Sequence, residues 1–320
     1  MGRGGGALPK ASRTGLVERS RVTAPPTIEA GVPLARLTTV GIGGPARAFA
    51  RPRTLAELEH VLAWAAAERL DVRPIGLGSN VLAADDGVDA LVLRLEGELA
   101  AVEVQGETLL AGGGAANAVC LHRARAAGLG GFEFACAIPG TAGGGVRMNA
   151  GAYGSDWRAI LGRALVVDAD GSTWLSGDEL ELSYRHSALG PGRVVAQVEF
   201  HLASRPVLEI KETIAAMQAM RKETQPTNKR TFGSVFKNPD HDLGAGRMIE
   251  DCGLKGYRLG GALVSPRHAN FIENAGGASA HDALALMVEA RLMVLERFGV
   301  ALEREVELLG GIELPELGPV

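Results

Sequence analysis

Two glycine-rich segments carry the clearest chemical signal in this sequence. The first is Gly76-Leu77-Gly78-Ser79-Asn80, which follows a predicted strand, and the second runs from Pro139 to Ala152. Because glycine has no side chain, several backbone N–H groups in such loops can converge on one anion, usually a phosphate. Two loops from distant segments predict a grip on a diphosphate from both sides. The alternative is that both segments are tight turns between strands.

The familiar fingerprints of nucleotide binding are absent from the sequence. Neither a complete G-x-G-x-x-G motif nor a G-x-x-x-x-G-K-[ST] motif occurs in the chain. A Rossmann domain and a P-loop are therefore unsupported, and a dinucleotide would be bound in another kind of fold.

Three polar residues stand out as candidates for chemistry on a substrate. Arg185, in SYRHS, could hold a carboxylate through two parallel hydrogen bonds, although a surface loop arginine would read the same way. Ser234, in GSVFKNP, could deliver a proton if a cation such as Lys237 assisted it, or it could simply occupy a turn. Glu305 is flanked by Glu303 and Glu307, an alternation that predicts one face of a strand, which is commonly solvated.

The surrounding pattern predicts the elements that must position these residues. A capping box at Thr54 and Glu57 begins a helix, and strands flank Gly106. A helix is expected over residues 115–127 with Gly128 as its stop, and a hairpin is expected to turn at Asp170-Gly171. Two further helices are expected, over residues 207–223 and from Ala280 to Phe298 before Gly299.

Hairpins and helices that do not alternate strictly predict an α+β fold. We expect a disordered extension over residues 1–25, one subdomain over 26–96, a second over 97–205 and a further domain over 206–299. Residues 300–320 are predicted to form a final strand and a tail, and the strand, within 300–312, is expected to return to the first subdomain.

Composition excludes several classes of protein. The 320 residues are 46% hydrophobic and 22% charged with a net charge of −4, which does not favour a nucleic-acid partner. No apolar run approaches the roughly 20 residues of a membrane helix, and the seven histidines show no metal-ligand spacing. The three cysteines have no paired spacing, which favours a reducing, cytoplasmic location. A monomer is the default expectation.

Six short motifs, in order, identify a family resemblance. They are GLGSNVL (76–82), FEFACAIPGTAGGGVRMNAGAYGSD (132–156), SYRHS (183–187), TQP (224–226), GSVFKNP (233–239) and HANFIEN (268–274). Across residues 30–312 the chain resembles the UDP-N-acetylenolpyruvoylglucosamine reductase family, also called UDP-N-acetylmuramate dehydrogenase. Only 49 positions separate Arg185 from Ser234, which resembles the shorter subclass that lacks an inserted loop with a substrate-covering tyrosine.

The resemblance implies a fold and a cofactor. It implies two α+β subdomains of the vanillyl-alcohol-oxidase type that clamp FAD, together with a third domain that binds a UDP-sugar. FAD would be reduced by NADPH, for which the sequence shows no separate domain, so that NADPH and the sugar nucleotide would share one cleft in turn. By this resemblance the cofactor-binding residues are Gly76, Gly78, Ser79, Asn80, Pro139, Gly140, Thr141, Gly143, Gly144, Asn149, Gly151 and Ala152.

The resemblance also implies a reaction and its residues. The enolpyruvyl ether of UDP-N-acetylglucosamine would be reduced to a lactyl ether, a step of peptidoglycan precursor synthesis. The implied catalytic residues are Arg185 for the enolate, Ser234 as proton donor and Glu305 as its assistant. The implied substrate contacts are Gln225, Lys237 and Asn238. Two alternatives are an FAD-dependent alcohol or lactone oxidase on the same fold, and an inactive protein that only binds flavin or sugar nucleotide.

Overall fold

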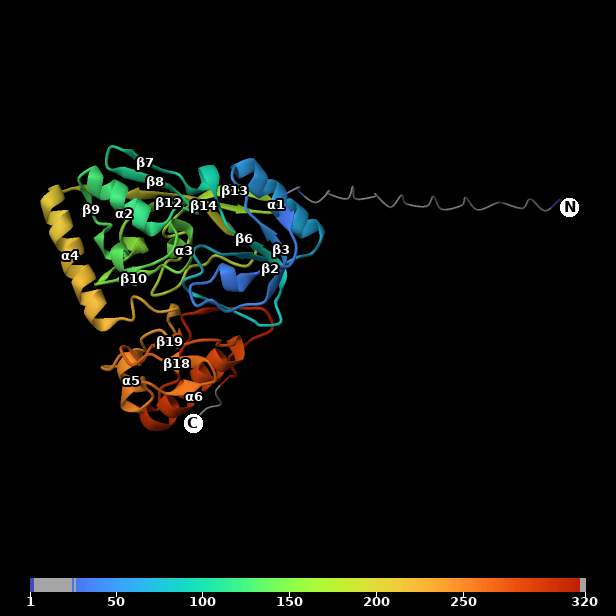
Figure 1. Ribbon diagram of the computed structural model, residues 1–320. Coiled ribbons are helices and arrows are strands. Elements are labelled where there is room, and N and C mark those ends of the chain that lie inside the picture. Colours follow the sequence, from blue (N-terminus) through green and yellow to red (C-terminus); the bar gives the residue numbers. More distant parts are fainter. Residues whose placement is uncertain (3–24, 26, 317–320) are drawn as a thin grey trace.

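The computed structural model describes residues 1–2, 25 and 27–316 of the chain and confirms the α+β prediction. Figure 1 shows two sheet-containing units in the upper body, named here the first and second units, and a smaller third unit below them. The predicted extension over residues 1–25 and the end of the predicted tail lie almost wholly outside the described residues. No helix in the described part of the chain is long and apolar enough to span a bilayer.

The first unit is a five-stranded sheet with one helix. Its strand order is β1-β3-β6-β4, with β2 also paired to β3. Thr54 caps the helix by accepting a hydrogen bond from the Glu57 N–H at 3.2 Å, but Glu57 accepts from Arg53 N–H, so the predicted capping box is only half formed. The elements are β1 (Ile28–Glu29), β2 (Val32–Pro33), η1 (Leu34–Arg36), β3 (Pro45–Ala50), α1 (Leu55–Ala67), β4 (Val72–Pro74), β5 (Val81–Ala83) and β6 (Val88–Leu93).

The second unit is an antiparallel sheet in the order β13-β12-β14-β8-β7, covered by helices. The predicted strands around Gly106 are confirmed, and the hairpin is confirmed one residue earlier than expected, because Asp168 pairs with Gly171. Its elements are η2 (Gly97–Ala100), β7 (Val102–Gln105), β8 (Thr108–Gly112), α2 (Asn117–Ala126), β9 (Leu129–Gly130), η3 (Glu133–Ala137), α3 (Ala142–Arg147), β10 (Gly151–Ala152), β11 (Ser155–Asp156), η4 (Trp157–Ala159), β12 (Leu161–Asp168), β13 (Gly171–Ser176), β14 (Val194–His201) and β15 (Ala203–Ser204).

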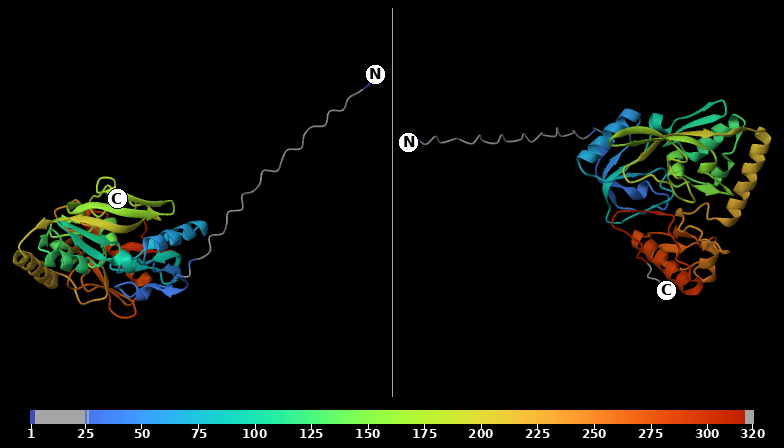
Figure 2. Two further views of the ribbon diagram at one scale, coloured as in Figure 1. Left: turned by 90° about the horizontal axis from the view of Figure 1, so that it is seen from above. Right: turned by 180° about the vertical axis from the view of Figure 1, so that it is seen from behind.

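The predicted boundary near residue 205 does not separate the units in space. Helix α4 (Val207–Thr224) lies along the edge of the second unit, as Figure 1 and the view from behind in Figure 2 show. Its buried Ile210 and Ile214 belong to the same apolar core as the second sheet. The chain therefore enters the third unit only after α4.

The third unit is a small antiparallel sheet, β16-β19-β18-β17, packed against two helices. The predicted helix from Ala280 to Phe298 is confirmed, and it ends at Gly299 with a left-handed φ of 67°. The elements are β16 (Thr231–Ser234), α5 (Ala245–Asp251), β17 (Arg258–Leu259), β18 (Ala262–Val264), β19 (Phe271–Asn274) and α6 (Ala280–Phe298). The last strand, β20 (Glu307–Leu309), leaves this unit and pairs in parallel with β5.

The second glycine segment is not a loop throughout. Residues 142–147 form the short helix α3, capped by Thr141. Gly145 in this helix faces the fully buried Trp157, which packs edge-on against Phe132 and Phe134. A Cβ atom at Gly145 would collide with the Trp157 ring, so this glycine is required for packing.

We expect Gly145→Ala to lower the free energy of unfolding by about 1–3 kcal/mol, because an added methyl overpacks the aromatic core. Gly144→Ala is the matched control, since its nearest contact would be Thr141 Oγ1 at 3.4 Å, and it should change stability by no more than about 1 kcal/mol. Urea unfolding of the flavin-free protein measures both values. Equal destabilisation by the two substitutions would contradict the packing role of Gly145.

Candidate active site

Residues of all three units line a cavity of about 560 Å³. Both glycine segments line it, together with Arg185, Gln225, Ser234 and Glu305, so the structure brings together residues spread over most of the chain. A second cavity of about 370 Å³ adjoins it. The residues that line both cavities are Pro74, Ile75, Gly76, Leu77, Thr141, Gly144 and Arg147.

The two glycine segments touch each other directly. Ser79 Oγ donates a hydrogen bond to the Pro139 carbonyl oxygen at 2.6 Å. A Cβ atom at Gly76 would lie 2.7 Å from Thr141 Oγ1, which is closer than real Cβ atoms approach. Gly78 adopts a left-handed φ of 65°, and a side chain there would strike the Leu37 carbonyl. Glycine is therefore needed at residue 76 for the two loops to meet, and at residue 78 for the first loop to pack against Leu37.

The backbone of these loops offers donors to the cavity. Residues 76–80, 140 and 141 all line the cavity, and none of their N–H groups donates a hydrogen bond to another described residue. Buried or half-buried N–H groups are rarely left without an acceptor. A row of such donors on a cavity wall suits an anionic ligand group with several oxygens.

Three of the predicted cofactor-binding residues have other tasks. Asn149 is fully buried, donates to the Ser183 carbonyl at 2.8 Å and accepts from the Arg158 N–H at 2.9 Å, so its side chain holds the loop and does not line the larger cavity. Gly143 lines only the smaller cavity, and its N–H donates to the Gly113 carbonyl. The Asn80 side chain donates to the Glu305 carbonyl at 3.1 Å.

The remaining predicted cofactor-binding residues line the larger cavity. They are Gly76, Gly78, Ser79, Pro139, Gly140, Thr141, Gly144, Gly151 and Ala152, and Asn80 lines it as well.

Arg185 and Glu305 form an ion pair on the cavity wall. Arg185 sits in the tight turn from Ser183 to His186 with a left-handed φ of 52°. Its Nε donates to Glu305 Oε1 at 2.9 Å and one Nη donates to the Gly151 carbonyl at 2.7 Å. Five N–H donors belong to a guanidinium, so three of them stay free for a ligand.

Glu305 is placed by pairing with the segment that follows Ser234. Its N–H donates to the Val235 carbonyl at 2.8 Å, and Phe236 bridges Arg304 in antiparallel fashion. This pairing carries Ser234, at the end of β16, and Glu305 to the same wall of the cavity.

The expected strand through Glu303, Glu305 and Glu307 is wrong in its extent. Regular strand geometry begins only at Glu307. Glu303 is 77% exposed in its side chain and reaches Lys237 Nζ at 3.3 Å, whereas the Glu305 side chain is 19% exposed within the cavity wall. The three carboxylates therefore do not share one solvated face, because tertiary pairing overrides the local alternation.

Two of the three predicted substrate contacts lie away from the cavity lining. Lys237 is engaged with Glu303, and Asn238 Oδ1 accepts from the Ala245 N–H at 3.0 Å, which stabilises the start of α5. Gln225, directly after α4, does line the cavity. Because Lys237 is ion-paired with Glu303 and does not line the cavity, the assistance that this lysine would have given Ser234 is not direct.

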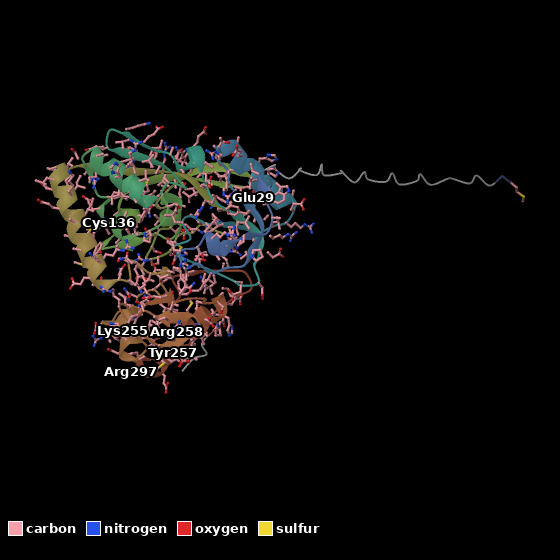
Figure 3. All side chains as sticks on the ribbon, viewed as in Figure 1. Glu29, Cys136, Lys255, Tyr257, Arg258 and Arg297 are labelled. Carbon is pink, nitrogen blue, oxygen red and sulfur yellow. The ribbon has the colours of Figure 1, made fainter. Side chains whose placement is uncertain are left out.

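Four cations line the cavity that the sequence analysis did not assign: Arg73, Arg147, Arg221 and Lys229. Arg221, in the last turn of α4, donates to the carbonyl of Cys136, which is labelled in Figure 3, at 3.2 Å. With Arg185 they face only two carboxylates in the lining, Glu305 and Glu307. Lys255, Arg258 and Arg297, also labelled in Figure 3, belong to the third unit and are not part of this lining.

The sequence contained little to identify these cations. An isolated arginine within a glycine run marks Arg147, but Arg73, Arg221 and Lys229 have the sequence surroundings of ordinary surface cations. Only the fold brings them to one cavity.

Burial controls the acidity of Glu305. Removal from water raises the pKa of its carboxyl above the ordinary value, and the opposing attraction of Arg185 and then of Lys237 is smaller. The site thus contains a carboxyl that holds its proton more tightly than usual, beside a permanently charged guanidinium.

Family models match two parts of the chain. A model described as an FAD binding domain matches residues 46–176. A model described as the C-terminal domain of UDP-N-acetylenolpyruvoylglucosamine reductase matches residues 225–309.

Relatives match nearly the full length. The chain is 44% identical over 294 residues to UDP-N-acetylenolpyruvoylglucosamine reductase 2 of Symbiobacterium thermophilum, covering 91% of this chain and 95% of that protein. It is 44% identical to the reductase of Myxococcus xanthus over 88% of this chain and 92% of that one. The crystal structure of the Thermus caldophilus reductase superimposes with a TM-score of 0.77 at 36% identity, covering 88% of this chain and 98% of that chain.

The raised pKa of Glu305 predicts a pH-dependent term in stability. The folded protein binds this proton more tightly than the unfolded chain, so as pH rises through the interval between the two pKa values the free energy of unfolding decreases. Glu305→Gln removes this term. The free energy of unfolding of the variant, relative to that of the parent, should therefore increase from about pH 4 to about pH 8.

Urea unfolding of both flavin-free proteins across that pH range measures the trend. Loss of the hydrogen bond to Arg185 lowers the stability of the variant by a similar amount at each pH, so it does not affect this trend with pH. A relative gain by the parent on raising the pH would show that attraction to Arg185 outweighs burial.

Proposed function

The chain belongs to the UDP-N-acetylenolpyruvoylglucosamine reductase family, and from this premise we propose that it reduces the enolpyruvyl ether of UDP-N-acetylglucosamine to UDP-N-acetylmuramate with NADPH and FAD. This reaction supplies a precursor of peptidoglycan. The observation that carries the proposal is one cavity that joins the unpartnered amides of both glycine loops to Arg185, Ser234 and Glu305. A monomeric state and a cytoplasmic location stay predictions.

The residues of the two loops suit FAD. The unpartnered N–H groups of residues 76–80, 140 and 141 would hold its diphosphate, since glycines keep this wall free of side chains. The two cavities adjoin at Gly76, Thr141 and Gly144, which leaves room on both sides of that wall for the two ends of an elongated cofactor. In this proposal the first and second units hold FAD and the third unit holds the sugar nucleotide.

The chemistry supplied by bound FAD is transfer of hydride from NADPH to the outer vinyl carbon of the substrate. Negative charge then develops on the inner carbon and, through conjugation, on the substrate carboxylate. Arg185 has free N–H donors on the cavity wall and can hold that carboxylate through paired, charge-assisted hydrogen bonds. Its contacts to Glu305 and Gly151 keep the guanidinium oriented before substrate arrives.

Ser234 is the proposed proton donor to the inner carbon. Ser234 lines the cavity at the end of β16, and the neighbouring backbone is fixed by the pairing with Glu305. A serine hydroxyl is a weak acid, so the proton must be replaced as it leaves. Glu305, whose pKa is raised by burial, is a proton reservoir on the same wall and would assist that transfer.

The basic end of the cavity suits the diphosphate of the sugar nucleotide. Arg221, Gln225 and Lys229 lie at the end of α4 and directly after it, and all three line the cavity. Cations and an amide in this position can hold phosphate oxygens while the enolpyruvyl group extends toward Ser234.

Turnover separates this function from its alternatives. We expect the purified protein to be yellow and to oxidise NADPH only when the enolpyruvyl sugar nucleotide is present. Oxygen-dependent turnover of an alcohol would instead indicate an oxidase, and a yellow protein inert to both would indicate a binding protein.

Ser234→Ala tests the proton donor. NADPH should still bleach the flavin colour at close to the parental rate, because this half of the reaction needs no proton from Ser234. Return of the colour on adding substrate should slow by about 10²–10⁴-fold, the usual contribution of a positioned proton donor. Rapid mixing measures each half separately, and equal slowing of both would remove Ser234 from this role.

A further inference from the structure

Arg147 is a cation whose position no part of the function above explains. It occupies the last position of α3 and lines both cavities at their junction. One Nη donates to the Arg193 carbonyl at 3.2 Å, which fixes the direction of the side chain and leaves most of its donors free.

The charge of Arg147 is not matched by an acidic group of the chain. No carboxylate of the described residues lies within ion-pair distance of its guanidinium. Burial lowers its pKa, the more distant Glu307 raises it, and Arg73 lowers it further. A half-buried cation without a counter-ion is costly unless a ligand supplies the negative charge.

The backbone N–H groups at the start of α3 have partners within the protein and are not available to bind an anion beside Arg147. The Ala142 and Gly143 N–H groups donate to the Ala115 and Gly113 carbonyls, each at 2.9 Å. The Gly144 N–H points at Thr141 Oγ1 at 3.4 Å. The donors of this short helix are therefore used within the protein.

The free backbone N–H donors at the junction of the two cavities belong to residues outside α3. Gly76 and Thr141, which have unpartnered N–H groups, line both cavities as Arg147 does. Unpartnered amides and one guanidinium thus belong to residues that share the junction of the two cavities, where the middle of an elongated cofactor would lie.

We propose that Arg147 is the cationic partner of the FAD diphosphate. The amides of the two glycine loops would donate hydrogen bonds to the diphosphate, and Arg147 would supply the positive charge that those neutral amides lack. This inference rests on the proposed function, because it takes FAD as the occupant of both cavities. Arg147 is thus a cofactor-binding residue that fixes the position of the diphosphate at the junction of the cavities.

The test compares the flavin-free parent with Arg147→Gln and Arg147→Lys. FAD affinity is measured by quenching of flavin fluorescence across a series of potassium chloride concentrations. We expect Arg147→Gln to weaken FAD binding by about 10- to 100-fold at low salt, as for loss of a charge-assisted hydrogen bond. Arg147→Lys should recover part of that loss, because it retains the charge without the planar fork.

The salt series distinguishes a direct contact from a structural one. Because screening weakens charge attraction, the parent should lose FAD affinity more steeply with salt than Arg147→Gln does. Urea unfolding of the flavin-free proteins should show no loss of stability in Arg147→Gln, since an unmatched cation has been removed.

Arg163→Gln is the control. Arg163 lines neither cavity and is ion-paired with Glu199 at 2.7 Å, so its removal should leave FAD affinity within about threefold of the parent.

The outcomes separate the two proposals. Parental FAD affinity in Arg147→Gln, or a loss that is equal at every salt concentration, would overturn the role of Arg147 and leave the proposed function intact. A parent that binds no FAD would instead overturn the proposed function.

Discussion

The hydrogen bond from Ser79 to the Pro139 carbonyl holds the candidate site together. It joins segments sixty residues apart in sequence, one from each of the two upper units. The two loops touch through this bond and through the contact of Gly76 with Thr141, and the N–H groups of residues 76–80, 140 and 141 have no acceptor within the described chain. The close approach that glycine permits at residue 76 thus places unpartnered donors from both loops on one wall of the cavity.

The return of the chain after α6 ties the third unit to that wall. Asn80 donates to the Glu305 carbonyl, and the Glu307 N–H donates back to the Asn80 carbonyl at 3.0 Å. Strand β20 then pairs with β5 directly after the first glycine loop. Glu305 is thus fixed between the first loop on one side and the Val235 backbone on the other. This arrangement sets the position of a carboxyl from the end of the chain relative to loops from its beginning.

The sequence was sufficient to predict helices and turns that depend on interactions between residues close together in the chain. Helix α6 follows its apolar spacing and ends at a left-handed glycine. Gly106 lies in the turn between two short apolar segments that form the paired strands β7 and β8. It was not sufficient where tertiary contacts decide. Gly143 and Gly145 resemble the cofactor-loop glycines in sequence, yet they serve close packing against Gly113 and Trp157. Likewise, Asn149 and Asn80 gave the pattern of ligand-binding amides, but their side chains bond to the protein backbone. The four unassigned cations come from separate elements, and no pattern within one segment could gather them.

The charge of the lining would let one cavity serve more than one ligand in the proposed function. Five basic side chains and two acidic ones line it, so the empty cavity has an excess of positive charge in a partly buried setting. FAD, NADPH and a UDP-sugar each carry a diphosphate, and each would reduce the repulsion among these cations on binding. In the proposed function, the end with residues 76–80 and Arg147 would hold FAD, and the end with Arg221 and Lys229 would bind the ligands that are exchanged during turnover. If NADPH and the sugar nucleotide both use that end, they must do so in turn, and the family's two half-reactions would follow from the electrostatics of one shared wall.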